Sequence, residues 1–539
     1  MAGPMAGLTA GLTAGRTAGL TARLTARSLV TRWALPGALV LALSGVGVAE
    51  VAVAQRTPAV AVPPVAAGTL PLALKAPTTV CPGPETLLVP DGGTPAPPTG
   101  PVVVGELTGA TAGPKVGLAT VTPTSAGPVL LARGAPATPG APASPGAAAA
   151  AATVSAVSAV SAVQVTLGRS GDLRGLAATT CAEPAGSVWL VGGGTGQGRR
   201  ARLLLANPTA VPAVVDVVPH GPAGPVAATG GQALVVPPGR EIAVFVDAIA
   251  PGIEQLAVQV VARSGRVVAV LHDTLVRGTV SGGVDDVTVA APPATEQVVP
   301  GLALAAPGVA SVRIAVPGPV EGVIKVRLLG PDGALDLPSA VATIPAGGVA
   351  DVPLTGLPDG TYTAVVDADV PVVAAGLVTT TVPGGELAGT PDAVGRQVPP
   401  SELAWVASAS ALRGAVGIVV PALPSVSGIA PVRATLVLAS PGPARVTVRQ
   451  VGPDGVPGAG QDVALPGGTT SVIALDAGTA AVLVTPPGAP GTGGPAYASL
   501  LLQTSDRSGP MLSTVPLRPG PSARPAAPAV VADPALGLG

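Results

Sequence analysis

One pattern of short apolar runs and Gly-Pro turns occurs three times between residues 187 and 517, and it limits the fold more than any other feature of this sequence. In each copy an apolar, β-branched run is followed by a second one, which leads into a turn. The turns are Gly221-Pro222-Ala223-Gly224, Gly330-Pro331-Asp332-Gly333 and Gly452-Pro453-Asp454-Gly455. Proline presets φ at the first turn position and glycine accepts positive φ, so hairpin connections are predicted. The period of about 110–120 residues is far longer than a solenoid repeat and is typical of β-sandwiches.

The runs between the turns have the composition and alternation of strands. Ile324, Val326 and Leu328 are apolar, and the intervening Lys325 and Arg327 are charged. This alternation of apolar and charged residues is typical of a strand with one buried and one solvated face. Gly (74) and Pro (65) make up roughly a quarter of the 539 residues, which in a polar chain would indicate disorder, but 48% of the residues are hydrophobic. The chain can therefore build cores from its many small Ala and Val side chains.

These signals predict an all-β protein of tandem immunoglobulin- or fibronectin-like β-sandwiches that follow an N-terminal signal or anchor helix. The sandwiches are expected over residues 185–292, 295–386 and 400–517. Residues 55–184 are expected to form irregular β structure with a low-complexity insertion at 134–163, and residues 518–539 a disordered Pro/Ala tail.

The first 54 residues have the pattern of an export signal. Arg16, Arg23, Arg27 and Arg32 precede an uncharged apolar stretch at 33–49, which Glu50 ends before the small-residue segment 51–54. This order predicts a cytoplasmic leader and either a signal peptide cleaved near Ala54 or an uncleaved helix anchored in the cytoplasmic membrane. The rest of the chain is then expected outside the cytoplasm, as an anchored or a secreted protein.

Two cysteines, Cys81 and Cys181, are the only pair available in that oxidising setting. A bridge between them would close a loop of about 100 residues and contribute on the order of 4–5 kcal/mol in the chain-entropy model. The alternative is two separate buried thiols. Their number and spacing exclude CxxC redox chemistry and a multi-cysteine zinc site.

Few residues are candidates for catalysis or metal binding. His272-Asp273 invites comparison with a hydrolase, but neighbouring strand residues point to opposite faces, so Asp273 is badly placed to orient His272. His220 is expected to be a solvated turn residue. Asp285-Asp286 lacks further calcium ligands in the pattern and is expected in a solvated loop. No catalytic residue, metal site or cofactor is predicted.

A glycine-rich segment, Gly192 to Gly198, resembles a phosphate-binding loop. Phosphate binding by such a loop needs a helix directly after it, whereas here an apolar strand follows, so a glycine hairpin is the expected structure. The basic residues that follow, Arg199 and Arg200, are possible contacts for an anionic envelope polymer. The net charge of −1 and the lack of basic runs argue against nucleic acid as a partner.

Aromatic residues are scarce: three Trp, two Tyr and one Phe. Trp189 and Trp405 each lie in the expected opening strand of a sandwich, and Phe245, Tyr362 and Tyr497 lie in other expected strands. Each can be the large core residue of its domain. Trp189 and Trp405 can alternatively bind a sugar or protein partner, although a stacking platform needs several rings on one face.

Two sequence stretches resemble a known family. They are Cys81-Pro82-Gly83-Pro84-Glu85 and Cys181-x-x-Pro184 continuing through Trp189-Leu190-Val191-Gly192-Gly193 to Leu205-Ala206-Asn207-Pro208. With the N-terminal apolar segment and the repeats, they are similar to the actinobacterial envelope family called domain of unknown function 5719, over roughly residues 60–517. The resemblance implies export and membrane attachment, and it implies no catalytic residues.

The leading functional hypothesis is a non-enzymatic scaffold of the cell envelope that presents its β-sandwiches to an unknown envelope protein or polymer, with the membrane as a further partner through the N-terminal segment. A cell-wall or polysaccharide-binding protein is the alternative, and an extracytoplasmic hydrolase is the third.

Overall fold

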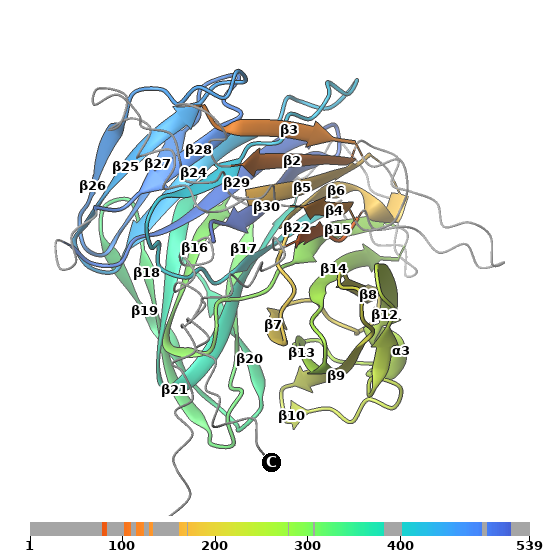
Figure 1. Cartoon of the computed structure of the whole chain (residues 1–539). Coiled ribbons are helices and arrows are strands. Elements are labelled where there is room, and N and C mark those ends of the chain that lie inside the picture. The colour runs from red at the N-terminus through yellow and green to blue at the C-terminus, as the bar shows by residue number, and fades with distance from the viewer. Residues whose placement is uncertain are drawn as a thin grey trace, which may run out of the picture. The chain divides into compact units, whose positions relative to one another are not determined.

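The computed structural model describes residues 78–83, 102–108, 115–122, 129–132, 161–169, 171–278, 280–305, 308–381, 401–487 and 493–518. All of them belong to one compact unit, Leu72–Ala527. In these ranges the chain is almost entirely β, with short antiparallel strands arranged in several sheets (Figure 1). The predicted leader, the signal or anchor helix at 33–49 and nearly all of the 518–539 tail lie outside the described residues. Among the described residues, no helix is both long and apolar enough to cross a membrane.

The strands fall into four modules, of which the first repeat shows the arrangement most fully. It has two sheets, with strand orders β10-β9-β13-β7 and β12-β8-β14-β15, and β11 also pairs with β9. One hydrophobic core draws on both sheets. Its elements are β7 (Ser187–Val191), β8 (Arg199–Asn207), β9 (Ala213–Gly221), β10 (Gly224–Pro225), β11 (Leu234–Val236), β12 (Arg240–Phe245), α3 (Val246–Ile249), β13 (Ala257–Ser264), β14 (Val268–Arg277) and β15 (Val280–Val287). We call it the first module.

The last repeat, the third module, has the same topology. Its sheets are β23-β28-β25-β26 and β27-β24-β29-β30, so each strand has a counterpart at the same position in the first module. The strands are β23 (Val416–Val419), β24 (Arg433–Ser440), β25 (Ala444–Val451), β26 (Gln461–Leu465), β27 (Thr469–Ala474), β28 (Ala481–Thr485), β29 (Tyr497–Asp506) and β30 (Gly509–Pro516). The shared order shows that the sequence repeat is a repeat of topology.

The second module differs because one long strand serves both of its sheets. The first half of β21 pairs with β16 and β18, and its second half pairs with β17 and β22. The strands are β16 (Ala294–Leu304), β17 (Val309–Ala315), β18 (Gly322–Leu329), β19 (Ala334–Ile344), β20 (Val349–Leu354), β21 (Gly360–Thr381) and β22 (Ser401–Ala407). β22, which carries Trp405, was expected to open the third sandwich, but it pairs with β21 and completes the second module.

Residues before 185, expected to form irregular β structure, contain a four-stranded sheet of order β3-β2-β5-β6 and a two-stranded sheet β1-β4. We call this the N-terminal module. Its elements are β1 (Thr78–Cys81), β2 (Val102–Thr108), β3 (Gly117–Val121), β4 (Val129–Ala132), β5 (Ser161–Gly168), η1 (Gly171–Leu173) and β6 (Gly175–Thr180). The end of the predicted 134–163 insertion therefore belongs to β5. The β5-β6 hairpin corresponds to β14-β15 in the first module, so this is a reduced copy of the same arrangement.

The last strand of each module packs against its counterparts in a closed cycle. β6 contacts β15, β15 contacts β22, β22 contacts β30, and β30 returns to β6. The labels of these four strands lie together in Figure 1. One hydrophobic core includes Val163 and Leu176 of the N-terminal module together with Leu500 of the third module, so the first and last parts of the repeat share buried surface. The modules are therefore interlocked, and we call the meeting of these four strands the central junction.

Local sequence explains these strands and turns. In β18, Ile324 and Val326 are buried and the intervening Lys325 is exposed, as the alternation predicted. Gly333 and Gly455, which end two of the repeated turns, have φ angles of +143° and +76°. These angles favour glycine because a Cβ would clash with the backbone there.

Candidate functional site

Four residues that the sequence singles out, Trp405, Arg199, Asp273 and Asp285, meet at or beside the central junction. Trp405 of β22 is 2% exposed, and its ring lies beneath two guanidinium groups, 4.9 Å from Arg313 and 5.6 Å from Arg199. Its Nε1 donates a hydrogen bond of 2.8 Å to Oδ2 of Asp273. Arg199 donates to both oxygens of Asp273, at 3.0 and 2.6 Å. Cation–π contacts and paired hydrogen bonds thus hold the indole of the second module to β8 and β14 of the first.

Arg313 of β17 makes the reverse connection, from the second module into the first. It is 2% exposed, and Asp351 accepts two of its hydrogen bonds at 2.7 and 2.8 Å. The same guanidinium donates to the carbonyl oxygens of Gly193, Glu254 and Leu256 in the first module. The glycine-rich segment therefore accepts an arginine of this same chain through its backbone.

Asp285 of β15 links three further strands. Its Oδ2 accepts a bond of 2.7 Å from the backbone N–H of Trp405, and its Oδ1 accepts one of 2.8 Å from Ser513 of β30. The Ser513 hydroxyl in turn accepts the N–H of Ala178 of β6 at 3.1 Å. Burial, reinforced by the neighbouring Asp286 carboxyl, raises the pKa of Asp285 well above its usual value. One carboxyl group thereby connects all four modules.

Arg174, just before β6, joins the N-terminal module to the third. It donates two bonds to Asp506, at 3.0 and 2.7 Å, and one to the Gly509 carbonyl oxygen at 3.1 Å. It also lies 3.7 Å from Glu402 of β22. Burial raises the pKa of Glu402 well above its usual value, although Arg174 opposes the shift. Charges that would be costly to bury alone are paired here between modules.

His272 and Asp273 face opposite sides of β14, as strand alternation requires. Asp273 points to the junction, and the Nδ1 atom of His272 forms a buried hydrogen bond with Asp286 on the other side. The cavity lined by His272 and Asp286 has a volume of about 10 Å³, roughly that of one water molecule. Asp285 and Asp286 belong to strand β15 and are buried, so the prediction of a solvated loop is wrong for them.

Trp189 of β7 is 6% exposed and packs against His220 with ring centroids 4.8 Å apart. Nδ1 of His220 forms a hydrogen bond of 2.8 Å with the Gly347 carbonyl oxygen of the second module, and burial lowers the pKa of His220. The expectation that His220 is solvated is therefore wrong. No local sequence pattern indicates this contact, because Gly347 lies 127 residues further along the chain.

Arg200 is the most exposed of the four possible binding residues, with 58% of its side chain accessible and Asp172 at 3.4 Å. The other three, Trp189, Arg199 and Trp405, have the internal contacts described above. The glycine-rich segment before Arg200 leads directly into strand β8, as expected. The Thr195 hydroxyl in this segment donates a hydrogen bond to the Ala250 carbonyl oxygen and accepts one from the Ile253 N–H.

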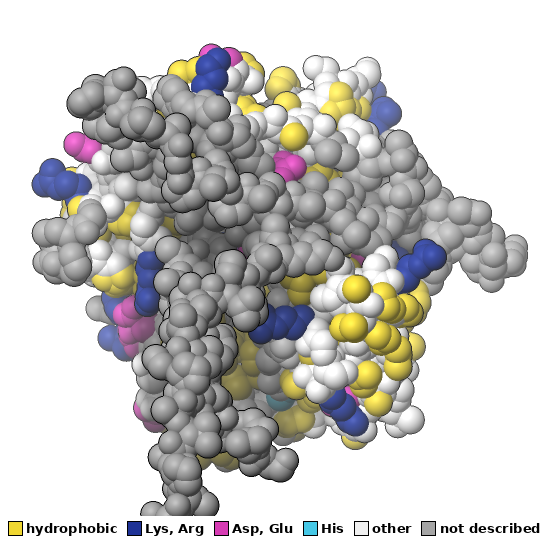
Figure 2. Space-filling view, in the orientation of Figure 1, with side chains coloured by type: hydrophobic (Ala, Val, Ile, Leu, Met, Phe, Trp, Pro, Cys, Tyr) yellow, Lys and Arg dark blue, Asp and Glu magenta, His cyan; other side chains and the backbone are white. Residues whose placement is uncertain are grey.

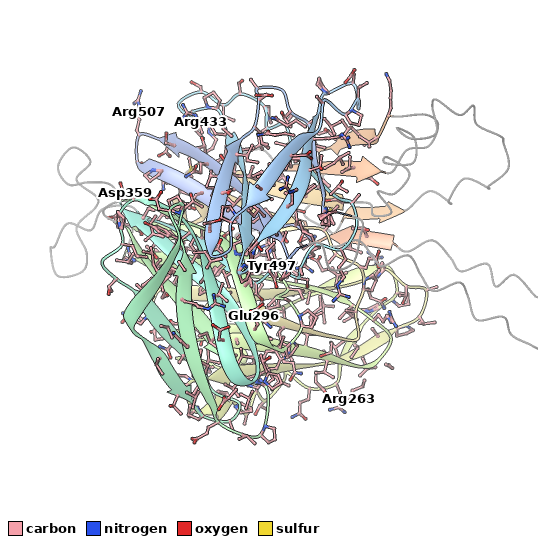
Figure 3. The ribbon with its side chains drawn as sticks, turned by 90° about the vertical axis from the view of Figure 1, so that its left-hand side faces the viewer. Arg263, Glu296, Asp359, Arg433, Tyr497 and Arg507 are labelled. Atoms are coloured by element: carbon pink, nitrogen blue, oxygen red, sulfur yellow. A yellow bond between two sulfur atoms is a disulfide. The ribbon has the colours of Figure 1, made fainter. Side chains whose placement is uncertain are left out.

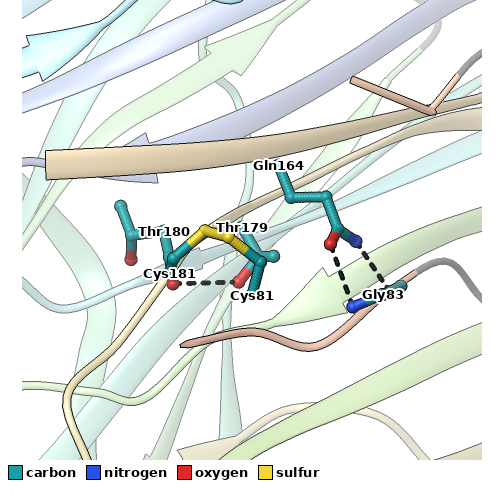
Figure 4. The surroundings of a disulfide bond; sticks show 6 residues. All are labelled: Cys81, Gly83, Gln164, Thr179, Thr180 and Cys181. Atoms are coloured by element: carbon teal, nitrogen blue, oxygen red, sulfur yellow. Dashed lines mark hydrogen bonds between the residues drawn. A yellow bond between two sulfur atoms is a disulfide. The ribbon is translucent and has the colours of Figure 1, made fainter. Parts of the chain in front are cut away.

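Cys81 and Cys181 form a disulfide bond that joins β1 to the residue after β6 (Figure 4). Beside it, Gln164 of β5 accepts a hydrogen bond of 3.0 Å from the N–H of Gly83 and donates one of 2.7 Å to its carbonyl oxygen. Within the N-terminal module, the bridge and this amide pair hold β1 and the two residues after it to β5 and to the residue after β6.

The second and third modules also meet at Glu296 and Tyr497, which lie near each other in Figure 3. The Tyr497 hydroxyl donates a long bond of 3.5 Å to Glu296, and burial raises the pKa of Tyr497 to about 12. In the same interface Thr470 donates to the carbonyl oxygen of Leu329 at 2.7 Å.

Sequence reasoning missed Arg174, Arg313 and Glu402. A usable signal existed, because Arg313 and Glu402 are single charges within runs of otherwise apolar or small residues. Such a residue on a buried strand needs a partner, but the partner cannot be identified without the fold. Among the described residues, no three His, Cys, Asp or Glu side chains are grouped so that they could hold a metal ion.

The family described as "Family of unknown function (DUF5719)" matches residues 134–476, a shorter span than the 60–517 expected from the sequence motifs. No curated protein and no solved structure matches the chain.

Proposed function

Because the chain belongs to a family of unknown function, DUF5719, we propose its role from its own contacts: it is a non-enzymatic scaffold of the cell envelope. The observation that carries the proposal is that the residues considered for catalysis or metal binding form buried contacts within the chain. Asp273 binds Trp405, Asp285 binds Ser513, and His272 binds Asp286, all with little or no exposure. Side chains committed in this way stabilise a fixed arrangement of modules, which is what a scaffold requires.

We place this scaffold outside the cytoplasm, anchored in the cytoplasmic membrane by the segment at 33–49 or secreted after cleavage near Ala54. The Cys81–Cys181 disulfide supports an oxidising compartment. We further propose that the paired sheets are immunoglobulin- or fibronectin-like sandwiches and that the protein is actinobacterial, in keeping with its high Ala, Gly and Pro content.

The partner that we propose is an envelope protein or polymer. On the face drawn in Figure 2, Lys and Arg side chains are scattered, and hydrophobic side chains gather over the first module. Nucleic-acid binding usually relies on a continuous basic surface, so this distribution favours a less charged partner. Val211 and Val235 of the first module are 59% and 57% exposed.

A polysaccharide-binding role is the second candidate. A stacking platform would need exposed rings, yet Trp189, Trp405, Tyr362 and Tyr497 are all buried. A sugar would therefore have to bind mainly through hydrogen bonds to surface polar groups such as Arg200. The hydrolase hypothesis comes third, because the space beside His272 is about 10 Å³.

The test is a binding and turnover assay with the purified full chain and isolated envelope. We expect retention on the envelope fraction that persists in the His272→Gln variant, with no release of sugar or peptide fragments. Arg433→Gln, a change at an exposed site, is the matched control. Reproducible hydrolysis that is lost in His272→Gln, while the melting temperature stays near that of the parent, would overturn the proposal.

A further inference from the structure

A cavity of about 420 Å³ lies beside the C-terminal ends of the four strands of the central junction. Its wall includes residues at or just after the C-terminal ends of β6, β15, β22 and β30, namely 180–183, 289–292, 408–410 and 516–518. All four modules therefore contribute to one space, next to Cys181 of the disulfide. The volume lies in the range of small-molecule sites, which is about 300–1,000 Å³.

Most of the residues that line this cavity are small or apolar, and one of them carries a positive charge. Val188, Ala290 and Ile418 belong to the apolar part, and Arg518 is the cation. Arg518 donates a hydrogen bond of 2.6 Å to the Val289 carbonyl oxygen, and among the described residues it has no ion pair with a carboxylate. Glu183 also lines the cavity but is engaged in an interaction of its own. A guanidinium has five N–H donors, so Arg518 keeps donors for a ligand.

Surrounding protein lowers the pKa of Arg518 to about 10. The guanidinium is therefore still charged near neutral pH, and Arg518 is only partly exposed to solvent. A charge in such surroundings is normally paired with an opposite one. Two threonine hydroxyls in the same wall, those of Thr79 and Thr180, are also buried without a hydrogen-bond partner in the described part of the chain.

We propose that this cavity binds a small aliphatic carboxylate. The carboxylate group pairs with the Arg518 guanidinium, whose fork of N–H groups matches two carboxylate oxygens. The aliphatic part lies against Val188, Ala290 and Ile418. Because every module contributes to the wall, the site exists only in the assembled chain.

The experiment is isothermal titration calorimetry of the full chain with hexanoate as the probe. Saturable binding is expected, with affinity at least about 10-fold weaker for the neutral analogue hexanamide, since a charged hydrogen-bonded pair contributes about 1.5–3 kcal/mol. Arg518→Gln should weaken hexanoate binding by a similar factor and leave hexanamide unchanged. Arg518→Lys should keep part of the affinity because it keeps the charge.

Two further variants separate the cavity from other sites. Ala291→Leu adds volume to the wall and should weaken binding of both probes, whereas Arg433→Gln, on an exposed part of the third module (Figure 3), should change neither. If Arg518→Gln is poorly folded, the comparison of hexanoate with hexanamide in the unaltered protein decides the question. Absence of saturable hexanoate binding, or equal affinity for the two probes, would refute the proposal.

Discussion

The indole Nε1 of Trp405 donates a hydrogen bond of 2.8 Å to Oδ2 of Asp273, across the boundary between the second and first modules. The two residues lie 132 positions apart in the chain, and both are buried. Around them, Arg199 and Arg313 place their charges over the same indole ring. The contact shows how the modules depend on one another for buried polar partners.

Replacing Trp405 with Phe should therefore destabilise the protein beyond the loss of ring area. The change removes the N–H donor and leaves Asp273 with Arg199 alone, at an expected cost of about 1–3 kcal/mol. Urea unfolding followed by far-UV circular dichroism measures it. Trp189→Phe is the matched control, because Trp189 is also buried and its contact is a ring contact with His220, with no hydrogen bond from its indole N–H among the described residues. Equal losses in the two variants would contradict the role assigned to the Asp273 bond.

The disulfide should contribute strongly to stability, because it closes a loop between residues separated by 100 positions. Cys81→Ala combined with Cys181→Ala is expected to lower the free energy of unfolding by about 4–5 kcal/mol. A reducing agent should lower the urea midpoint of the parent protein and have no effect on the double variant. An unchanged midpoint for the reduced parent would show that the bridge is not formed in solution.

Glu241 of β12 should make stability depend on pH. Burial raises its pKa from 4.5 to about 7, although His272 and Arg202 oppose the shift. The folded state thus favours the protonated form, and stability falls as pH rises from about 4.5 to about 7. Glu241→Gln stays neutral, so its stability relative to the parent should increase by about 2 kcal/mol between pH 5 and pH 8.

Unfolding midpoints measured at several pH values check this prediction. Glu321→Gln, at an exposed position, controls for the loss of one negative charge. A difference between Glu241→Gln and the parent that is constant from pH 5 to pH 8 would count against a buried Glu241 carboxyl.

A substitution at Gly283 of β15 tests how closely β15 approaches β22. Its φ is +110°, and a Cβ added there would lie 2.4 Å from the backbone N of Leu403. Gly283→Ala should therefore cost about 2–4 kcal/mol through strain and overpacking. Gly414→Ala, with φ of +70° and no atom within 4 Å of the added Cβ, should cost only about 1 kcal/mol. Thermal unfolding compares the two, and a similar loss in both would exclude tight contact at the junction.

The sequence by itself determined the β class, the three long repeats and the hairpin turns, because strand alternation and turn chemistry are local. Ile324 to Leu328 alternate as expected, and the glycines at 333 and 455 have the positive φ that their turns require. With only two cysteines, Cys81–Cys181 was the one disulfide that the sequence allowed, and the structure decides for it over two separate thiols.

Only the tertiary structure decided which module each strand completes and what the charged residues do. Trp405 lies in the expected first strand of the third predicted sandwich, yet this strand pairs with β21 and completes the second module. The partners of Arg174, Arg313 and Asp285 lie up to 335 residues away. Contacts over such distances arise from packing of the modules, which leaves no local pattern, and the cavity beside Arg518 exists for the same reason.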